Sequence, residues 1–246
     1  MEAELPHYVR KFQGVLDQLE ENAVVAVITM TGSCCPVTVA HINAFGRARD
    51  ALLGAGGFEP LPNLEPFGEV LGLLSLNGDR HVHDKMASKG HKAVSYAHRS
   101  ELVQVATAEM PWMDFNPGRE HHVIGRLELH WPHLRFIRFA LNGADDVIKY
   151  QKWRGAGPDH RYITMGRPGF TEKVVQEATR DGVPLDQGYF VIVPESSQEV
   201  ADVSSTMVRG LLKVGNSESL SRVLHPGVAE WLLQSGIYGP PPPPGT

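Results

Sequence analysis

The sequence has few cysteines, no long apolar run and no excess of positive charge. Its only two cysteines, Cys34 and Cys35, are neighbours, and neighbouring Cα atoms lie about 3.8 Å apart, which is below the usual disulfide range. Without a disulfide framework we expect a reducing intracellular compartment, and the sequence leaves open whether it is cytoplasmic or nuclear. The formal net charge is −5, from 28 acidic residues against 23 Lys and Arg, so no nucleic-acid partner is expected. No apolar run approaches the roughly 20 residues that cross a bilayer, so no membrane partner is expected either.

The length of the chain predicts a single domain, and its first residues do not resemble a secretory signal. The first residues, MEAELPHYVRKFQG, mix charges and lack an apolar core and a cleavage site, so we expect no secretory signal. A chain of 246 residues can bury one sizeable core, and no internal repeat is visible. We therefore expect one domain over residues 1–246, with an N-terminal helix at about 6–21, a core at about 22–238 and a disordered proline-rich tail at 239–246.

Apolar runs typical of buried strands alternate with helical patterns along the core. The predicted strands are residues 23–30, 69–76, 112–115, 134–141, 161–166 and 189–193, and the polar residues 77–92 are expected to form a long loop. Strands separated by helices indicate βαβ units. We therefore predict an α/β fold, a Rossmann-like and mostly parallel sheet with helices on both faces. In such sheets ligands bind beyond the carboxyl ends of the strands.

The first of these ends is followed by a candidate phosphate site. Residues 31–33 interrupt the apolar run, and Thr38 is a good N-cap for the next helix. A helix N-terminus presents unpaired N–H groups and the positive end of its dipole, which favours phosphate. Gly32 permits close backbone approach, Ser33 and Thr38 add hydroxyl donors, and His41 in the first helical turn could donate to a phosphate. The alternative is that His41 shares the core-facing stripe of the helix.

A second helix N-terminus follows the last predicted strand. In DVSSTMVRGLL, residues 202–212, Ser204 and Ser205 cap a helix, Thr206 lies in its first turn, and Arg209 follows within one further turn. An arginine fork can grip phosphate oxygens with two N–H groups. The alternative is an ordinary capped helix with a solvent-facing arginine. Two such helix starts that face each other could hold a triphosphate by both ends.

Both motifs resemble those of one family. GSCCPVTVAH, residues 32–41, resembles the GSFNPxTxxH element of the nicotinamide mononucleotide adenylyltransferases, members of the HxGH nucleotidylyltransferase superfamily, and VSSTMVR resembles their ISSTxxR element. The similarity extends in the same order over about residues 22–238, through DKMASKGHKAVSYAHR, EMPWMDFN, NGADDV and RVLHPGVAEWLLQSGIY. It implies transfer of the adenylyl group of ATP to nicotinamide or nicotinate mononucleotide, giving NAD or its deamido form and pyrophosphate.

The resemblance also implies roles for individual residues. His41, Arg209 and Lys89 would act on the phosphates, although the match of Lys89 to the loop lysine of the family is loose by a residue or two. Trp112 would stack on the pyridine ring, with Trp153 as a second candidate, and packing is the alternative for both. ATP would be bound by Gly32, Ser33, Thr38, Gly143, Asp145, Ser204, Ser205 and Thr206. Mg²⁺ or another divalent cation would be held mainly by the ATP phosphates, and no protein metal site is expected.

The sequence departs from the family pattern in the first motif, because Cys34-Cys35 replaces the usual Phe-Asn. One alternative is therefore another nucleotidylyltransferase of the superfamily, such as a cytidylyltransferase or a pantetheine-phosphate adenylyltransferase. The other is a degenerate nucleotide-binding module with a chaperone or scaffold role. The preference between the amidated and the acid mononucleotide stays open, as does the oligomeric state, with a homo-oligomer among the options.

Overall fold

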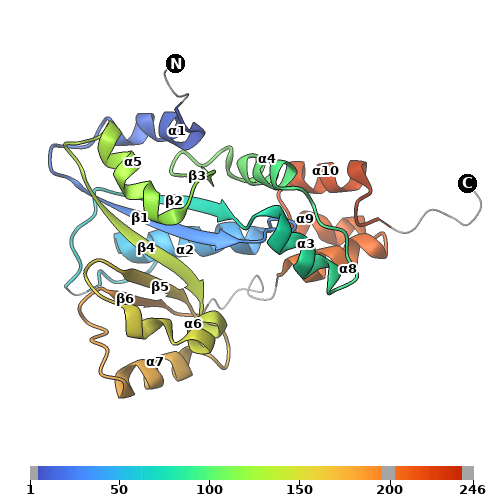
Figure 1. Cartoon of the computed structure of the whole chain (residues 1–246). Helices are drawn as coiled ribbons and strands as arrows, with labels where there is room; N and C mark the ends of the chain where they lie inside the picture. The colour runs from blue at the N-terminus through green and yellow to red at the C-terminus, as the bar shows by residue number, and fades with distance from the viewer. Residues whose placement is uncertain (1–4, 62, 196–202, 240–246) are drawn as a thin grey trace, which may run out of the picture.

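A six-stranded parallel sheet forms the centre of the computed structural model, which describes residues 5–61, 63–195 and 203–239 (Figure 1). Every neighbouring pair of strands is parallel, and the strand order is β3-β2-β1-β4-β5-β6. The strands are β1 (Val24–Gly32), β2 (Glu69–Leu76), β3 (Met113–Asn116), β4 (Arg135–Gly143), β5 (Arg161–Met165) and β6 (Phe190–Val193). The predicted α/β, Rossmann-like fold is confirmed, and the sheet is parallel throughout.

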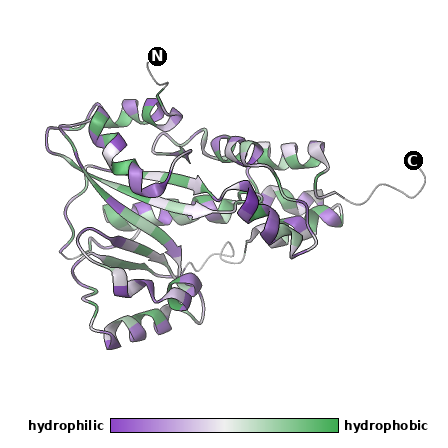
Figure 2. Ribbon diagram, in the orientation of Figure 1, coloured by the Kyte–Doolittle hydropathy of each residue, from purple (hydrophilic) through white to green (hydrophobic). Residues whose placement is uncertain are grey.

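Helices cover both faces of the sheet because successive strand side chains point to opposite sides. On one face Ala26 and Ile28 of β1 pack with α2 (Val39–Leu53), α4 (Tyr96–Thr107), α8 (Ser205–Lys213), α9 (Ser217–Val223) and α10 (Pro226–Ser235). On the other face Val25 and Val27 pack with α1 (His7–Leu16) and α5 (Val123–His130). A third cluster joins α6 (Ala144–Tyr150) and α7 (Thr171–Arg180) to β6. Figure 2 shows the strands as largely green and the outer helix surfaces as largely purple.

The strand order reverses beside β1, and this reversal positions the candidate site. The chain moves outward from β1 through β2 to β3, then returns to the other side of β1 as β4 and continues outward to β6. At such a reversal the connections leave the sheet in opposite directions, so a crevice opens at the carboxyl ends of the strands. α2 follows β1 at this edge, and α6 begins directly after the last residue of β4.

The prediction of a long loop over residues 77–92 was wrong. Residues Asp79–Ala87 form a helix, α3, whose Val82 and Met86 are buried in the core. These two residues lie four positions apart, so one narrow apolar stripe anchors a helix that is otherwise hydrophilic. Figure 2 colours most of α3 purple. Two apolar residues in a polar segment were too weak a periodic signal to predict a helix.

Several boundaries also differ from the predictions. The N-terminal helix is shorter than expected, since α1 ends at Leu16. A 3₁₀ turn, Glu120–His122, precedes α5, and a second 3₁₀ turn, Lys152–Gly155, follows α6. α9 was not predicted. Residues 240–246 of the predicted disordered tail lie outside the described residues. Within the described ranges, no helix has the length and apolar character needed to cross a membrane.

Candidate functional site

A pocket of about 310 Å³ opens at the carboxyl edge of the sheet. The arrowheads of β1 and β2 point toward the segments around it, α3 and α8 (Figure 1). Eight of the predicted site residues line this pocket: Ser33, His41, Lys89, Gly143, Ser204, Ser205, Thr206 and Arg209. They come from segments that are up to about 170 positions apart in the sequence, so the fold brings both helix N-termini to one place.

Side chains of α8 donate hydrogen bonds to backbone carbonyl oxygens of the turn between β1 and α2. Arg209 Nη1 donates to the carbonyl of Cys35 at 2.7 Å, and Ser205 Oγ donates to the carbonyl of Pro36 at 2.8 Å. Cys35 Sγ lies 2.9 Å from the hydroxyl of Tyr238, which follows α10. Gly32 faces the inside of this turn, since a Cβ there would lie 2.9 Å from Cys34 Sγ. The two phosphate motifs therefore form one hydrogen-bonded unit.

Thr38 and His41 together cap the N-terminus of α2. Thr38 is the N-cap residue, as predicted, and its backbone N–H donates to His41 Nδ1 at 3.2 Å. The hydroxyl of Thr38 also lies 2.8 Å from the same nitrogen. A backbone N–H can only donate, so Nδ1 must be the unprotonated nitrogen, and the proton of the neutral ring is on Nε2. Thr38 is buried behind the pocket and does not line it.

His41 stays neutral at physiological pH. Burial in the pocket wall, together with the smaller effect of the positive charges of Arg167 and Lys85, lowers the pKa of His41 to about 4. None of the described residues makes a hydrogen bond to Nε2. The ring therefore offers one neutral N–H donor to a ligand in the pocket, which is the chemistry needed to stabilise negative charge on a phosphate oxygen.

The three hydroxyl groups at the start of α8 differ in whether their O–H is free to donate to a ligand. Ser204 Oγ accepts from the backbone N–H of Met207 at 3.2 Å, which is the predicted cap. Thr206 Oγ1 accepts from Arg209 Nη2 at 3.0 Å. Both hydroxyls keep their own O–H for a ligand, whereas the O–H of Ser205 is used on the turn. Together with the backbone amides of the first helical turn that have no intrahelical acceptor, they give this end of α8 donors of the kind that favour an anion.

Arg209 is buried, with 1 % of its surface exposed, and does not extend a free fork into the pocket. Both of its Nη atoms make internal hydrogen bonds, to Cys35 and Thr206. Its Nε is buried and has no partner among the described residues. Arg209 therefore contributes a hydrogen bond that holds α8 to the turn, and it places a positive charge beside the α8 hydroxyls.

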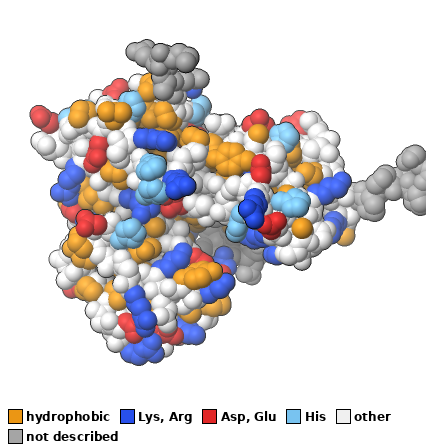
Figure 3. Space-filling view, in the orientation of Figure 1, with side chains coloured by type: hydrophobic (Ala, Val, Ile, Leu, Met, Phe, Trp, Pro, Cys, Tyr) orange, Lys and Arg blue, Asp and Glu red, His pale blue; other side chains and the backbone are white. Residues whose placement is uncertain are grey.

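The pocket lining is strongly cationic. It contains Lys85, Lys89, Arg167 and Arg209, and no carboxylate among the described residues that line it. Lys85 Nζ donates to Ser33 Oγ at 3.2 Å. Figure 3 shows Lys, Arg and His side chains gathered over α3. A pocket with four cations and no acid is suited to a polyanion such as a triphosphate.

Lys85 and Arg167 were missed in the sequence. Lys85 lies in α3 and Lys89 follows the end of this helix, but the whole segment had been predicted to be a loop. Arg167 follows β5 at the carboxyl edge, and its Nη1 lies 3.5 Å from Asp145 Oδ1. Its position after a strand was the only available signal.

Gly143 and Asp145 lie at the start of α6, beside Arg167. A Cβ on Gly143 would lie 2.7 Å from Asp145 Oδ1, so a larger residue there would displace this carboxylate. Gly143 lines the pocket, whereas Asp145 does not line it and pairs with Arg167. The adenosine contacts that the family resemblance implies for these two residues stay a prediction.

The two tryptophans lie outside this pocket. Trp112 precedes β3, and its ring packs beside the guanidinium of Arg49 at 5.2 Å and over the backbone of Gly72. It lines an adjoining cavity of about 410 Å³ that shares Ala40, Ala44, Met165, Arg167 and Val203 with the cationic pocket. Trp153 is 1 % exposed and donates from its indole N–H to Asp181 at 3.0 Å. Packing accounts for Trp153, and stacking by Trp112 stays a prediction.

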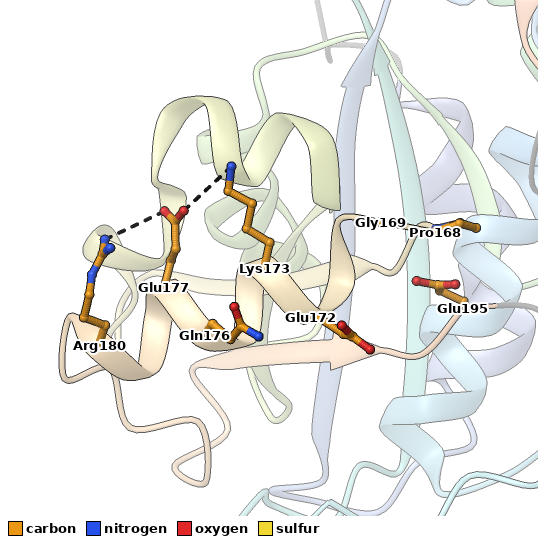
Figure 4. A pocket seen from close by; sticks show the side chains of 8 residues that line it. All are labelled: Pro168, Gly169, Glu172, Lys173, Gln176, Glu177, Arg180 and Glu195. Carbon is orange, nitrogen blue, oxygen red and sulfur yellow. Dashed lines mark ion pairs between the residues drawn. The ribbon is translucent and has the colours of Figure 1, made fainter.

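A larger groove of about 730 Å³ runs along α7, away from the predicted residues (Figure 4). Its side chains include Lys173 and Arg180, each of which forms an ion pair with Glu177 at 3.9 Å. Mutual neutralisation of exposed charges is typical of a solvated helix face, so this groove has no evident chemistry. In the part of the chain that the structure describes, no group of three or more His, Cys, Asp or Glu residues could hold a metal ion.

The comparisons with known proteins bear on the fold. No protein-family model matches the sequence, and no curated protein matches it. Among solved structures, a nicotinic acid mononucleotide adenylyltransferase of Plasmodium falciparum, complexed with APC, superposes with a TM-score of 0.56 at 11% identity over 87% of this chain and 96% of that chain. The same enzyme complexed with NaAD gives a TM-score of 0.56 at 12% identity, over 87% and 97% of the two chains. The chain therefore has a nucleotidyltransferase-like fold.

Proposed function

We propose that the protein transfers the adenylyl group of ATP to nicotinamide or nicotinate mononucleotide. The observation that carries this proposal is the composition of the pocket: four cations, one neutral histidine donor and the α8 hydroxyls, with no described carboxylate, at the carboxyl edge of a parallel sheet. The fold shared with the Plasmodium enzyme and the two sequence motifs support the same reaction.

The proposed reaction is an in-line displacement at the α-phosphorus of ATP. An oxygen of the mononucleotide 5′-phosphate forms a bond to this phosphorus, and the bond from it to the β-phosphate oxygen breaks, so pyrophosphate leaves. The attacking phosphate is already an anion, and no nucleophilic side chain is needed. The protein contributes positioning and stabilisation of the charge that develops on the transferring and leaving groups.

Each lining group has a role in this scheme. His41 Nε2–H donates to a phosphate oxygen, and Lys85 and Lys89 balance the charge of the leaving pyrophosphate. Ser204 and Thr206 donate to the phosphates from the start of α8. Since no carboxylate of the described residues lines the pocket, Mg²⁺ enters as part of the MgATP substrate and is held by phosphates and water.

A second candidate is an enzyme of the same superfamily that uses another acceptor. The two tryptophans that would recognise a pyridine ring both make packing contacts, which is why this candidate is retained. Trp153 is buried, and the Trp112 ring packs beside Arg49 and over Gly72. Neither indole faces the cationic pocket, so recognition of a pyridine ring would depend on the adjoining cavity.

A panel of acceptors separates the two candidates. Purified protein is incubated with MgATP and nicotinamide mononucleotide, nicotinate mononucleotide or phosphopantetheine, and with MgCTP and phosphocholine. The proposal expects a dinucleotide and equimolar pyrophosphate with at least one pyridine mononucleotide. Product with phosphopantetheine or phosphocholine alone would establish the second candidate. MgATP binding without product from any acceptor would favour a degenerate binding module.

A further inference from the structure

Arg99 of α4 is fully buried and joins three segments of the chain. Its Nε donates to the carbonyl of Val94 at 2.9 Å, its Nη1 to the carbonyl of Ser33 at 3.1 Å, and its Nη2 to Asp79 Oδ1 at 3.0 Å. Arg99 does not line the cationic pocket. Burying a guanidinium costs desolvation free energy, so its charge and its N–H donors must be paired with acceptors inside the protein.

Two of its partners belong to the segments that carry phosphate-facing groups. Ser33 lies in the turn after β1, and Asp79 is the first residue of α3, which carries Lys85. Lys85 in turn donates to Ser33 Oγ at 3.2 Å. The contacts form a closed ring that runs from Arg99 through Ser33 and Lys85, along α3 to Asp79, and back to Arg99.

The rest of α3 has few anchors. Only Val82 and Met86 of this helix are buried among its described side chains, and the other side chains face solvent or the pocket rim. A narrow apolar stripe holds a helix against a core, but it allows the helix to shift along its axis or rotate by a few degrees. Directional hydrogen bonds at the N-terminus of α3 remove this freedom.

We infer that Arg99 is a positioning residue that, through Asp79, fixes α3 with its Lys85, and the segment after α3 with Lys89, relative to the turn at Ser33. The inference rests on the proposed function, since it concerns the placement of Lys85 and Lys89 against the ATP phosphates. Arginine suits this role because its rigid fork supplies three donors in one plane, whereas a lysine cannot bond three separated acceptors in fixed directions.

The test uses Asp79→Asn, because the Asp79 side chain is 61 % exposed and its replacement leaves the buried arginine in place. Asp84→Asn is the matched control: it is the same substitution on the same helix, at a side chain that is 72 % exposed and contacts neither Arg99 nor Ser33. Lys85→Met removes the cation that Asp79 is inferred to position. Affinity for MgATP is measured by calorimetry for each variant and for the Asp79→Asn, Lys85→Met double variant.

The expected result is non-additivity. Asp79→Asn keeps an acceptor oxygen but loses its charge, so it should weaken MgATP binding about three- to tenfold, and Asp84→Asn should stay within about twofold. In the Lys85→Met background, Asp79→Asn should have a smaller effect than it has alone, because the lysine it positions is gone. Full additivity, or equal effects of Asp79→Asn and Asp84→Asn, would overturn the inference.

A second measurement separates this inference from the proposed function. Hydrogen–deuterium exchange of residues 79–90 in the ligand-free protein should be faster in Asp79→Asn than in Asp84→Asn. Unchanged exchange would refute the anchoring of α3 even if MgATP binds and reacts. Faster exchange in a protein that neither binds nor turns over MgATP would support the anchoring and refute the proposed function.

Discussion

The double role of His41 can be separated by three substitutions. Its Nδ1 caps α2 by accepting from Thr38 N–H at 3.2 Å, and its Nε2–H is available to the substrate. Glutamate and glutamine are the common residues at this helix position, because their side chains make the same reciprocal bond to the N-cap. His41→Glu and His41→Gln should therefore keep the cap, whereas His41→Ala should lose it. Only the charge and the donor differ between the first two variants.

The expected magnitudes follow from these contacts. Loss of the cap in His41→Ala should lower the free energy of unfolding by about 0.5–2 kcal/mol. Loss of one donor to a developing charge lowers kcat by about 10²–10³. A carboxylate about 4 Å from a phosphate charge, at an effective dielectric constant of about 20, costs about 4 kcal/mol, which is about a thousandfold in rate. His41→Glu should thus be as stable as His41→Gln and be the least active of the three.

The assay pairs urea unfolding with steady-state dinucleotide formation. We expect His41→Gln and His41→Glu to be more stable to urea than His41→Ala. The value of kcat/KM should instead decrease in the order His41→Gln, His41→Ala, His41→Glu. The opposite ranking of Ala and Glu in the two measurements is the decisive feature, because a purely structural histidine would give the same order in both. A His41→Glu variant with turnover within tenfold of wild type would refute a role for this residue at the phosphates.

The pH dependence of stability supplies an independent check on the same residue. The pKa of His41 is about 4 in the folded protein, and it is about 6.5 in an unfolded chain. Below pH 6.5 the unfolded state takes up a proton that the folded state refuses, so stability falls as the pH decreases from 6.5 to 4, by at most about 3 kcal/mol. His41→Gln should lack this part of the acid destabilisation in urea unfolding measured over that range.

Three further predictions concern the framework around the site. Arg161 and Arg135 hold the pKa of Glu65 down to about 2, so Glu65→Gln should lower the free energy of unfolding by about 1 kcal/mol at pH 7. The difference should shrink as the pH falls through about 2, and a pH-independent difference would argue against the ion pairs. Burial raises the pKa of the Cys34 thiol to about 12, and Cys35 is also buried, so a disulfide reagent at pH 8 should titrate no thiol in the folded protein and two in denaturant. Arg209→Lys keeps the charge but not both bonds of the fork, and should lower the urea midpoint together with MgATP affinity; an unchanged midpoint would contradict the bond to the turn.

Sequence patterns predicted the elements that are determined by residues close together in the chain. Residues 69–76 are apolar on both faces and form β2 with the predicted bounds. The caps at Thr38 and Ser204 were predicted for the same reason, since each acts on amides within its own helix. The parallel sheet followed from the alternation of strands and helices.

The parts that could not be predicted depend on contacts between distant segments. α3 is held by the burial of its Val82 and Met86 and by the pairing of its Asp79 with Arg99 of α4, a partner that the sequence pattern of this segment does not reveal. The commitment of both Nη atoms of Arg209 to Cys35 and Thr206 is also tertiary, so the sequence indicated a free phosphate fork where the structure has an internal tie.

The fate of labelled ATP phosphates tests the central proposal most directly. Wild-type protein is incubated with nicotinamide or nicotinate mononucleotide and with MgATP labelled either at the α- or at the γ-phosphorus, and the products are separated. Adenylyl transfer predicts that the α-label appears in the dinucleotide and the γ-label in pyrophosphate, in equal amounts. Transfer of the γ-label to the mononucleotide, its release as inorganic phosphate, or absence of any labelled product would contradict the account.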